Sequence, residues 1–223
     1  MKHLVVANWK MNPNSLVGAK RLFNSVKTRV RGLKGVNVVI CPPFVYLSEL
    51  SGLTLGAQNC FWKDKGAFTG EMSAKMLKDL SCKYVIVGHS ERRRYLKETC
   101  RMANEKIRAV LSNGLIPILC IDNIGQVRRG LKGFSKKEIK KVIVAYEPIF
   151  AIGTGKACSI EKAKKINLAI RKILGEKTVV LYGGSVNPEN AKAFIEKAQF
   201  QGLLIGSASL DAKKFNQIVK SLN

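Results

Sequence analysis

The chain has 223 residues and carries 39 lysines and arginines against 15 aspartates and glutamates, a formal net charge of +24. Its hydrophobic content of 46% excludes a disordered protein, and no apolar run approaches the roughly 18 residues that a membrane span needs. The positive charge indicates an anionic ligand, and it leaves nucleic acid, an anionic membrane and phosphorylated metabolites open as partners.

Eight short apolar segments recur along the chain, with no linker or break in composition between them. They are Leu4–Asn8, Val36–Cys41, Leu53–Gln58, Tyr84–Gly88, Leu115–Ile121, Val142–Tyr146, Thr178–Tyr182 and Gly202–Gly206. These segments are rich in valine, isoleucine and leucine and do not alternate with polar residues. Such runs are typical of parallel strands that are buried on both faces of a sheet.

Segments with helical spacing lie between these strands. Apolar residues recur every three or four positions in Ser15–Val30 and again in Ser159–Leu174. We predict a further helix that is capped by Asn187 and starts at Pro188, and a last helix that begins at Asp211. The segment 126–141 contains two glycines and many lysines, so its apolar periodicity fits a helix poorly.

The repeated order of strand and helix predicts an α/β fold with parallel strands and right-handed crossovers. Eight such units in 223 residues are short but sufficient for a (β/α)8 barrel, which typically has about 250 residues. We therefore predict a single domain over residues 1–223, a somewhat shortened (β/α)8 barrel. The alternative is a doubly wound open sheet, which usually shows a GxGxxG turn after an early strand, and residues 8–12 do not match that pattern.

The cysteines and histidines argue against a metal centre. Six cysteines are scattered without a CxxC pair, and the chain has only two histidines, so we expect no metal and buried, reduced thiols. Because the amino-terminal apolar run breaks at Asn8 without a cleavage site, no signal peptide is evident. We expect a cytoplasmic location without membrane association.

Polar side chains follow the predicted strands at the edge where a barrel of this kind holds its chemistry. Glu147 comes directly after a buried strand, where a partly desolvated carboxylate is suited to act as a base. His89 is either an acid or electrophile, or a packed core histidine. Lys10 is either an anion ligand or one lysine among many, and we expect Glu91 and Arg92 to form a structural ion pair.

Two glycine turns follow the last two strands, Gly183-Gly184-Ser185 and Gly206-Ser207. Glycines let the backbone approach a ligand closely, and unpaired N–H groups at a turn attract an anion. Either turn alone is better explained by the general use of glycine in tight turns. Two such turns after consecutive final strands instead favour a phosphate site.

The segment Gly153–Lys156 superficially looks like a nucleotide P-loop. It fails the GxxxxGK[ST] pattern, because Phe150 occupies the first glycine position and Ala157 the Ser/Thr position. A flexible lid that starts after Pro148 explains these glycines better.

Five segments together resemble the triosephosphate isomerase family. They are Ala7–Asn12, Gly66–Glu71, Gly88–Arg93, Ala145–Lys156 and Tyr182–Val186. The match is colinear, covers essentially the whole chain, and is highly specific in the second and fourth segments. The resemblance implies a barrel enzyme of glycolysis and gluconeogenesis that interconverts dihydroxyacetone phosphate and D-glyceraldehyde 3-phosphate, with neither cofactor nor metal.

The resemblance also implies catalytic roles. Glu147 corresponds to the base that moves a proton between adjacent carbons through an enediolate, and His89 to the neutral imidazole that polarises the carbonyl. Lys10 supplies positive charge to the substrate and Asn8 positions it. Glu91 and Ser90 are expected to support the site.

The resemblance further implies a phosphate site, a lid and a partner chain. The backbone N–H groups expected to hold the phosphate are those of Gly153, Ser185, Gly206 and Ser207. Residues 148–156 are expected to form the lid. The family is usually a homodimer, and the loop Gly66–Glu71 is expected to insert into the partner, with Thr69 reaching Asn8 of the partner subunit.

Some residues depart from the family pattern. Ser207 stands where a second glycine is usual, and its β-carbon would crowd the site if that position needed positive φ. Asp122-Asn123 stands in place of Gly-Glu, and Lys97 in place of Gly. The connections between strands 5 and 6 and between strands 6 and 7 are shorter than usual.

A second hypothesis is a basic barrel that binds nucleic acid or another polyanion, with weakened or lost catalysis. It is motivated by the net charge and by the basic runs Arg92–Arg94, Arg128-Arg129, Lys136-Lys137 and Lys140-Lys141. The chain shows no basic tract interleaved with aromatic residues, which single-stranded nucleic-acid binding favours. We therefore expect a small phosphorylated triose, and not nucleic acid, as the partner.

Overall fold

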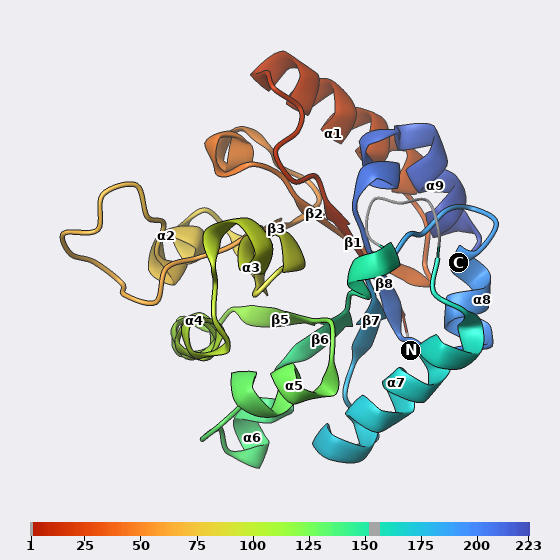
Figure 1. Cartoon of the computed structure of the whole chain (residues 1–223). Coiled ribbons are helices and arrows are strands. Elements are labelled where there is room, and N and C mark those ends of the chain that lie inside the picture. Colours follow the sequence, from red (N-terminus) through yellow and green to blue (C-terminus); the bar gives the residue numbers. More distant parts are fainter. Residues whose placement is uncertain (1, 152–156) are drawn as a thin grey trace.

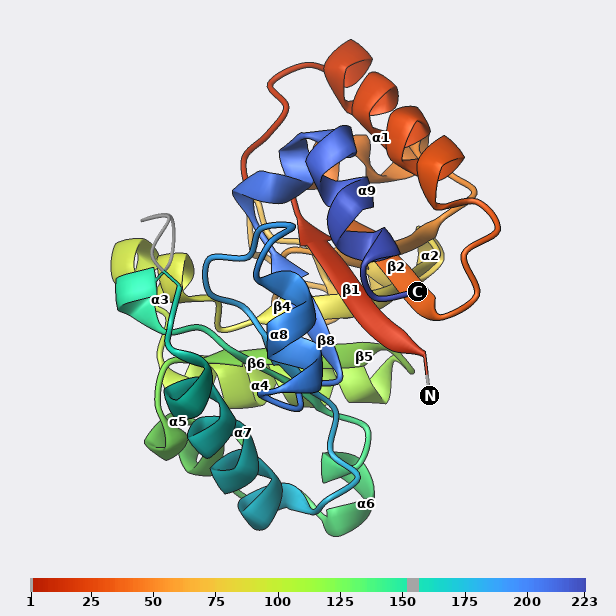
Figure 2. The same cartoon turned by 90° about the vertical axis from the view of Figure 1, so that its right-hand side faces the viewer.

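Eight parallel strands form a closed barrel in chain order in the computed structural model, which describes residues 2–151 and 157–223. Strand β1 pairs with β8 to close the barrel, and helices surround it (Figure 1). This closure confirms the predicted (β/α)8 barrel and excludes the doubly wound open sheet. Both chain ends lie toward the amino end of β1 (Figure 2), away from the rim at which β1 stops.

The strands are β1 (His3–Asn8), β2 (Val36–Cys41), β3 (Thr54–Ala57), β4 (Cys82–Val87), β5 (Ile116–Ile121), β6 (Ile143–Tyr146), β7 (Val180–Tyr182) and β8 (Gly202–Ile205). Each begins and ends within two residues of the segment predicted for it. In the register that closes the barrel, Val5 lies opposite both Val38 of β2 and Leu203 of β8.

Side chains of each strand alternate between the inside of the barrel and the helices outside. Leu4 and Val6 belong to the inner cluster of buried residues, whereas Val5 packs in the outer cluster beneath the helices. Since both faces are apolar, the sequence shows continuous apolar runs. The same two-residue period directs Asn8 and Glu147 to the inner side at the strand ends.

The α-helices are α1 (Leu16–Val30), α2 (Ala74–Asp79), α3 (Ser90–Leu96), α4 (Cys100–Ser112), α5 (Ile124–Gly130), α6 (Lys136–Ile139), α7 (Ile160–Leu174), α8 (Ala191–Glu196) and α9 (Ala212–Lys220); the 3₁₀ helices are η1 (Phe44–Glu49), η2 (Ile149–Ala151) and η3 (Ser207–Leu210). The predicted starts of three helices are confirmed. The side chains of Ser15, Ser159 and Asp211 accept backbone N–H groups at the first turns of α1, α7 and α9.

The predicted cap of α8 is wrong, because this helix begins at Ala191 and not at Pro188. The backbone N–H groups of Asn187 and Asn190 each donate to the other's side-chain Oδ1, both at 2.9 Å. These bonds close a turn that leads directly into the helix, since the Ala191 N–H donates to the Asn187 carbonyl at 3.1 Å. The Asn187 side chain therefore caps this turn and not the first turn of α8.

Two connections differ from a simple repeat of strand and α-helix. Strand β2 leads only to the 3₁₀ helix η1, since Pro43 starts a short connection that ends before β3. The weakly periodic segment 126–141 forms two short helices, α5 and α6, instead of one. Gly133 has φ +78° between them, and Ser135 with Glu138 forms a capping box that starts α6.

All six cysteines are free, and five of them are buried, as predicted. Burial raises the pKa of the Cys82 thiol to about 11 and that of the Cys60 thiol to about 12. Both thiols therefore stay protonated and weakly nucleophilic at neutral pH. Within the described ranges, no helix combines the length and apolar character needed to cross a membrane.

A buried charge cluster ties the ends of β3 and β4 to α4. The Glu98 carboxylate accepts from Lys106 Nζ at 2.6 Å, from Arg92 Nε at 2.7 Å and from the Gly88 backbone N–H at 3.0 Å. Lys106 Nζ also donates to Asn59 Oδ1 at 2.7 Å. Burial alone would raise the pKa of Glu98, but the two cations outweigh burial and lower it. For Lys106, burial prevails over the attraction of Glu98 and lowers the pKa.

We expect Lys106→Met to lower the free energy of unfolding by about 3–5 kcal/mol at pH 7, because it leaves Glu98 as a buried charge without its closest partner. The lowered pKa means that ionised Glu98 stabilises the fold above the pKa of the unfolded chain. This contribution is lost as the pH falls through the lowered pKa. The difference between wild type and variant in urea unfolding should therefore shrink in acid.

The matched control is Lys75→Met, since Lys75 is an exposed lysine of α2. Its effect should stay within about 0.5 kcal/mol. Equal destabilisation by the two variants would contradict a stabilising role for the buried cluster.

Candidate active site

The carboxyl ends of the strands enclose a cavity of about 250 Å³. The predicted site residues that line it are Asn8, Lys10, His89, Glu147, Ser185, Gly206 and Ser207. Ser90 and Glu91 line a neighbouring cavity, Thr69 lies on the loop between β3 and α2, and Gly153 lies outside the described residues. One rim of the barrel thus brings together the acid–base and the anion-binding candidates.

Glu147 lies directly after β6 with a side chain that is only 2% exposed. Its backbone N–H donates to the Ile121 carbonyl at 2.7 Å, which holds the residue against the end of β5. One carboxylate oxygen, Oε2, accepts the Ser90 backbone N–H at 3.1 Å, and the other, Oε1, lies 3.1 Å from His89 Nε2. A carboxylate with so little water around it is well placed to take a proton from a carbon atom.

His89 is buried at the start of α3, where its ring orientation is fixed by the backbone. Its Nδ1 accepts the Glu91 backbone N–H at 3.3 Å, which requires a lone pair on Nδ1. In the neutral ring the proton is therefore on Nε2, the nitrogen that faces Glu147 and the cavity. His89 is thus oriented to donate a hydrogen bond from Nε2, beyond being a packed core histidine.

Lys10 adopts a left-handed backbone conformation with φ +55°, which is costly for a residue other than glycine. Its backbone N–H donates to Asn8 Oδ1 at 3.0 Å, and its carbonyl accepts from Gln58 Nε2 at 2.7 Å. Its ammonium group forms an ion pair with Glu91. A β-carbon at Gly206 would lie 3.2 Å from Lys10 Cε. The absence of a side chain at Gly206 therefore leaves room for the Lys10 side chain to extend along the rim.

The predicted ion pair between Glu91 and Arg92 is wrong. Glu91 instead pairs with Lys10, and Arg92 pairs with Glu98. The two residues are adjacent on α3, and neighbouring side chains of a helix point about 100° apart, so they face different partners.

The turns after β7 and β8 form the opposite wall of the cavity. The Ser185 hydroxyl donates to the Ala151 carbonyl at 2.5 Å, and the Ser185 carbonyl accepts from Asn190 Nδ2 at 3.2 Å. Ser207 starts η3 without positive φ, so the crowding considered for its β-carbon does not arise. Lys97, by contrast, takes φ +55° at the end of α3, a conformation that glycine adopts at less cost.

Comparison with known proteins identifies the family. A family model described as triosephosphate isomerase matches residues 3–222. The chain belongs to the triosephosphate isomerase family. It is 41% identical to the triosephosphate isomerase of Dictyoglomus thermophilum, with 99% of each chain covered, and 42% identical to that of Fusobacterium nucleatum, with 100% of each chain covered. The family predicted from the sequence is confirmed.

The shortened connections fit these comparisons. The alignment with the Dictyoglomus thermophilum triosephosphate isomerase spans 248 positions, whereas this chain has 223 residues. The two short helices α5 and α6 occupy one of the connections that were expected to be short.

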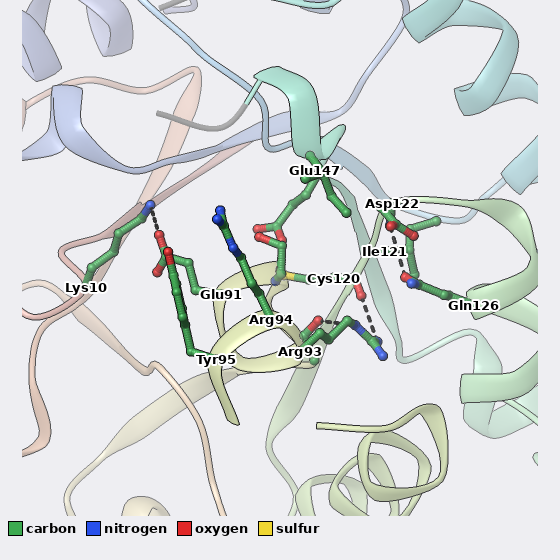
Figure 3. A pocket seen from close by; sticks show the side chains of 13 residues that line it. Lys10, Glu91, Arg93, Arg94, Tyr95, Cys120, Ile121, Asp122, Gln126 and Glu147 are labelled. Atoms are coloured by element: carbon green, nitrogen blue, oxygen red, sulfur yellow. Dashed lines mark hydrogen bonds and ion pairs between the residues drawn. The ribbon is translucent and has the colours of Figure 1, made fainter. Parts of the chain in front are cut away.

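A second cavity, of about 390 Å³, lies beside the first and shares Lys10 and Glu147 with it. Figure 3 shows Lys10 turned toward Glu91 on one wall, and Glu147 descending toward Cys120. The cavity therefore gives access to the flank of Glu147 that lies away from the glycine turns.

One departure from the family pattern, Asp122, borders this second cavity, and the other, Asn123, follows it in the chain. The Asp122 backbone N–H donates to Gln126 Oε1 at 3.0 Å (Figure 3), and the Asn123 side chain accepts the Gln126 backbone N–H at 3.2 Å. The Asn123 side chain therefore caps α5, and the Asp122 backbone closes the turn before the helix.

Two supporting residues carry no predicted role. Gln58 Nε2 donates to the carbonyls of Lys10 and Cys41, at 2.7 and 2.9 Å. A polar side chain directly after a buried strand indicates a residue of the rim, so the sequence could have predicted this supporting role. Tyr182 accepts the Cys158 backbone N–H at 3.0 Å through its hydroxyl. It lies within an apolar strand, where a tyrosine gives no sign of this bond.

We expect Gly183→Ala to lower kcat in an isomerase assay by about 10- to 100-fold, with a smaller change in KM. A β-carbon at Gly183 would lie 2.9 Å from Glu147 Cγ, so the carboxylate would be pushed out of its position beside His89. Steady-state kinetics measure the effect, and a thermal melt confirms that the variant is folded. A folded variant with wild-type kcat would show that this position does not control Glu147.

Proposed function

We propose that the chain interconverts dihydroxyacetone phosphate and D-glyceraldehyde 3-phosphate through an enediolate, as one domain over residues 1–223. Its family, and full-length relatives named triosephosphate isomerase, support this reaction. One observation carries the assignment of residues. The buried Glu147 carboxylate lies 3.1 Å from His89 Nε2, in a cavity bordered by two glycine turns.

Glu147 is the base in this proposal. Its carboxylate takes a proton from the carbon next to the carbonyl, and the resulting acid returns the proton to the neighbouring carbon. A second proton passes from the hydroxyl oxygen on the neighbouring carbon to the former carbonyl oxygen. Over the whole reaction no proton is therefore gained or lost, and the reaction needs neither a cofactor nor a metal. The low exposure of Glu147 supports the role, since water that reached the enediolate would compete for this proton.

His89 is the electrophile. Its Nε2–H donates to the carbonyl oxygen of the substrate and stabilises the negative charge that develops there. The bond from the Glu91 backbone N–H to Nδ1 uses the lone pair of that nitrogen, so the neutral ring carries its proton on Nε2. Lys10 adds positive charge on the same rim, and Asn8 orients the substrate.

The phosphate group is held, in this proposal, by the backbone N–H groups of Ser185, Gly206 and Ser207, with Gly153 of the lid. The three described residues line the cavity that also contains Glu147, which supports a substrate lying across it. Of the lid, η2 is described and contacts Ser185 through the Ala151 carbonyl. The part that contains Gly153 lies outside the described residues, and its role stays a prediction.

We propose a homodimer in which Thr69 reaches Asn8 of the partner subunit. The loop between β3 and α2 extends away from the barrel (Figure 1), and Thr69 is exposed on it. Contacts within the loop help to hold its conformation, since the ring centroids of Phe61 and Phe68 lie 4.6 Å apart. Met11 is 90% exposed and Phe68 41% exposed, and apolar side chains left in water favour burial against a second subunit.

Nucleic acid is not the partner that we propose. In the basic run Arg92–Arg94, the Arg92 guanidinium is paired with Glu98, and Arg93 Nε donates to the Gly88 carbonyl at 2.7 Å. Two of the three arginines are thus engaged inside the protein. Six free thiols also suit the cytoplasm, the reducing compartment in which we place the enzyme.

We expect Glu147→Asp to lower kcat by roughly 100-fold or more while KM changes little, since it withdraws the carboxylate by one methylene group without altering the phosphate turns. A coupled assay of glyceraldehyde 3-phosphate turnover measures both constants. Glu176→Asp makes the same change at an exposed position and should leave both constants unaltered. Wild-type turnover in Glu147→Asp would remove Glu147 from its role as base.

We expect Thr69→Arg to shift the protein from dimer to monomer and to lower kcat, because the bulky, charged arginine would not fit against Asn8 of the partner subunit. Sedimentation velocity and the same coupled assay measure the two effects. Thr28→Arg adds the same charge on the exposed face of α1 and should leave both the sedimentation coefficient of the dimer and kcat unchanged. A Thr69→Arg variant that sediments like the wild type would argue against the proposed interface.

A further inference from the structure

The turn between β7 and α8 contains two asparagines that bind each other. The Asn187 N–H donates to Asn190 Oδ1, and the Asn190 N–H donates to Asn187 Oδ1, both at 2.9 Å. The hydrogen bonds of the two side chains differ in one respect. The amide of Asn190 makes a further bond, from its Nδ2 to the Ser185 carbonyl at 3.2 Å.

Asn190 occupies the position before α8 at which an asparagine usually caps a helix. Its side chain nevertheless accepts no N–H group from the helix. Both ends of its amide point instead at the preceding turn, with Oδ1 on Asn187 and Nδ2 on Ser185. The side chain therefore orders the turn at the expense of a helix cap that typically contributes about 1 kcal/mol.

Ser185 is consequently held from two sides. Its carbonyl accepts from Asn190 Nδ2, and its hydroxyl donates to the Ala151 carbonyl. Among the residues that the structure describes, the Ser185 N–H has no acceptor, although Ser185 lines the cavity. A residue fixed through its carbonyl and its side chain keeps its remaining donor in one direction, which lowers the entropy lost when an anion binds.

We propose that Asn190 is a positioning residue for the phosphate group of the substrate and acts by holding the Ser185 carbonyl. This inference rests on the proposed function of Ser185 as a phosphate ligand. The role needs a side chain that donates and accepts at once, which an amide does and a carboxylate does not. Asn190 acts on the phosphate end of the substrate and leaves the proton transfer at Glu147 unchanged.

The test compares Asn190→Ser with Asn187→Ser. Serine at either position retains an oxygen that accepts the backbone N–H of the other, as Ser side chains do in turns. Only Asn190→Ser also loses the bond to the Ser185 carbonyl, because the serine side chain is too short to reach it. The two variants thus make the same chemical change at the two ends of one pair, and thermal melts confirm that both are folded.

We expect Asn190→Ser to raise the Kd of inorganic phosphate, measured by isothermal titration, by roughly fivefold to tenfold, and to raise the KM of glyceraldehyde 3-phosphate to a similar extent. Its kcat should change less than about twofold. Asn187→Ser should alter Kd and KM less than about twofold. Deuterium exchange into glyceraldehyde, which lacks the phosphate, should be equal in wild type and both variants.

Two results would overturn the inference. The first is an equal effect of the two variants on phosphate binding, which would assign the role to the turn as a whole. The second is an Asn190→Ser variant that binds phosphate like the wild type, or that loses glyceraldehyde exchange as well.

The inference and the proposed function can fail separately. A wild-type protein without isomerase activity would refute the proposed function. Weaker phosphate binding by Asn190→Ser would in that case still support Asn190 as a positioning residue. An active wild type, with unaltered phosphate binding in Asn190→Ser, would refute the inference alone.

Discussion

All eight strands of the barrel run in the same direction, and pairing between β1 and β8 fixes where each strand ends. One rim therefore collects residues that lie far apart in the chain, from Asn8 to Ser207. The inward side chains beneath this rim are apolar, as Ile86 and Ile118 illustrate. The polar groups of the rim therefore lie directly above a buried apolar layer. In such surroundings the few hydrogen bonds to Glu147 and His89 are stronger than they would be in water.

The rim itself is held by charges that lie outside the cavity. The peptide groups of Gly88 are fixed on both sides, since its N–H donates to Glu98 and its carbonyl accepts from Arg93. His89 follows directly, so its place beside Glu147 depends on ion pairs that do not themselves line the substrate cavity. The buried pairing of Glu98 with Lys106 extends this support to the base of the loop that carries Thr69.

Much of this arrangement could be predicted from the sequence, because a buried parallel strand leaves a continuous apolar run and the residue after it faces the rim. For this reason Glu147, His89 and the glycine turns were predicted to lie together. The predictions that were wrong concern hydrogen bonds and ion pairs, whose partners depend on which acceptor lies nearest in space. The Asn187 cap and the pairing of Glu91 with Arg92 are examples, since local spacing does not encode that choice. The bond between Lys106 and Asn59 joins residues 47 positions apart, and no local pattern points to it.

The pairing of β1 with β8 also has a consequence for biosynthesis. The first strand of the chain finds its second neighbour only at residues 202–205, and α9 behind it packs on α1. Until these last segments leave the ribosome, β1 presents an unpaired edge, and exposed edges of this kind invite pairing with other chains. The β1 edge therefore stays open until residues 202–205 have been synthesised, which makes its pairing a late, long-range step of folding.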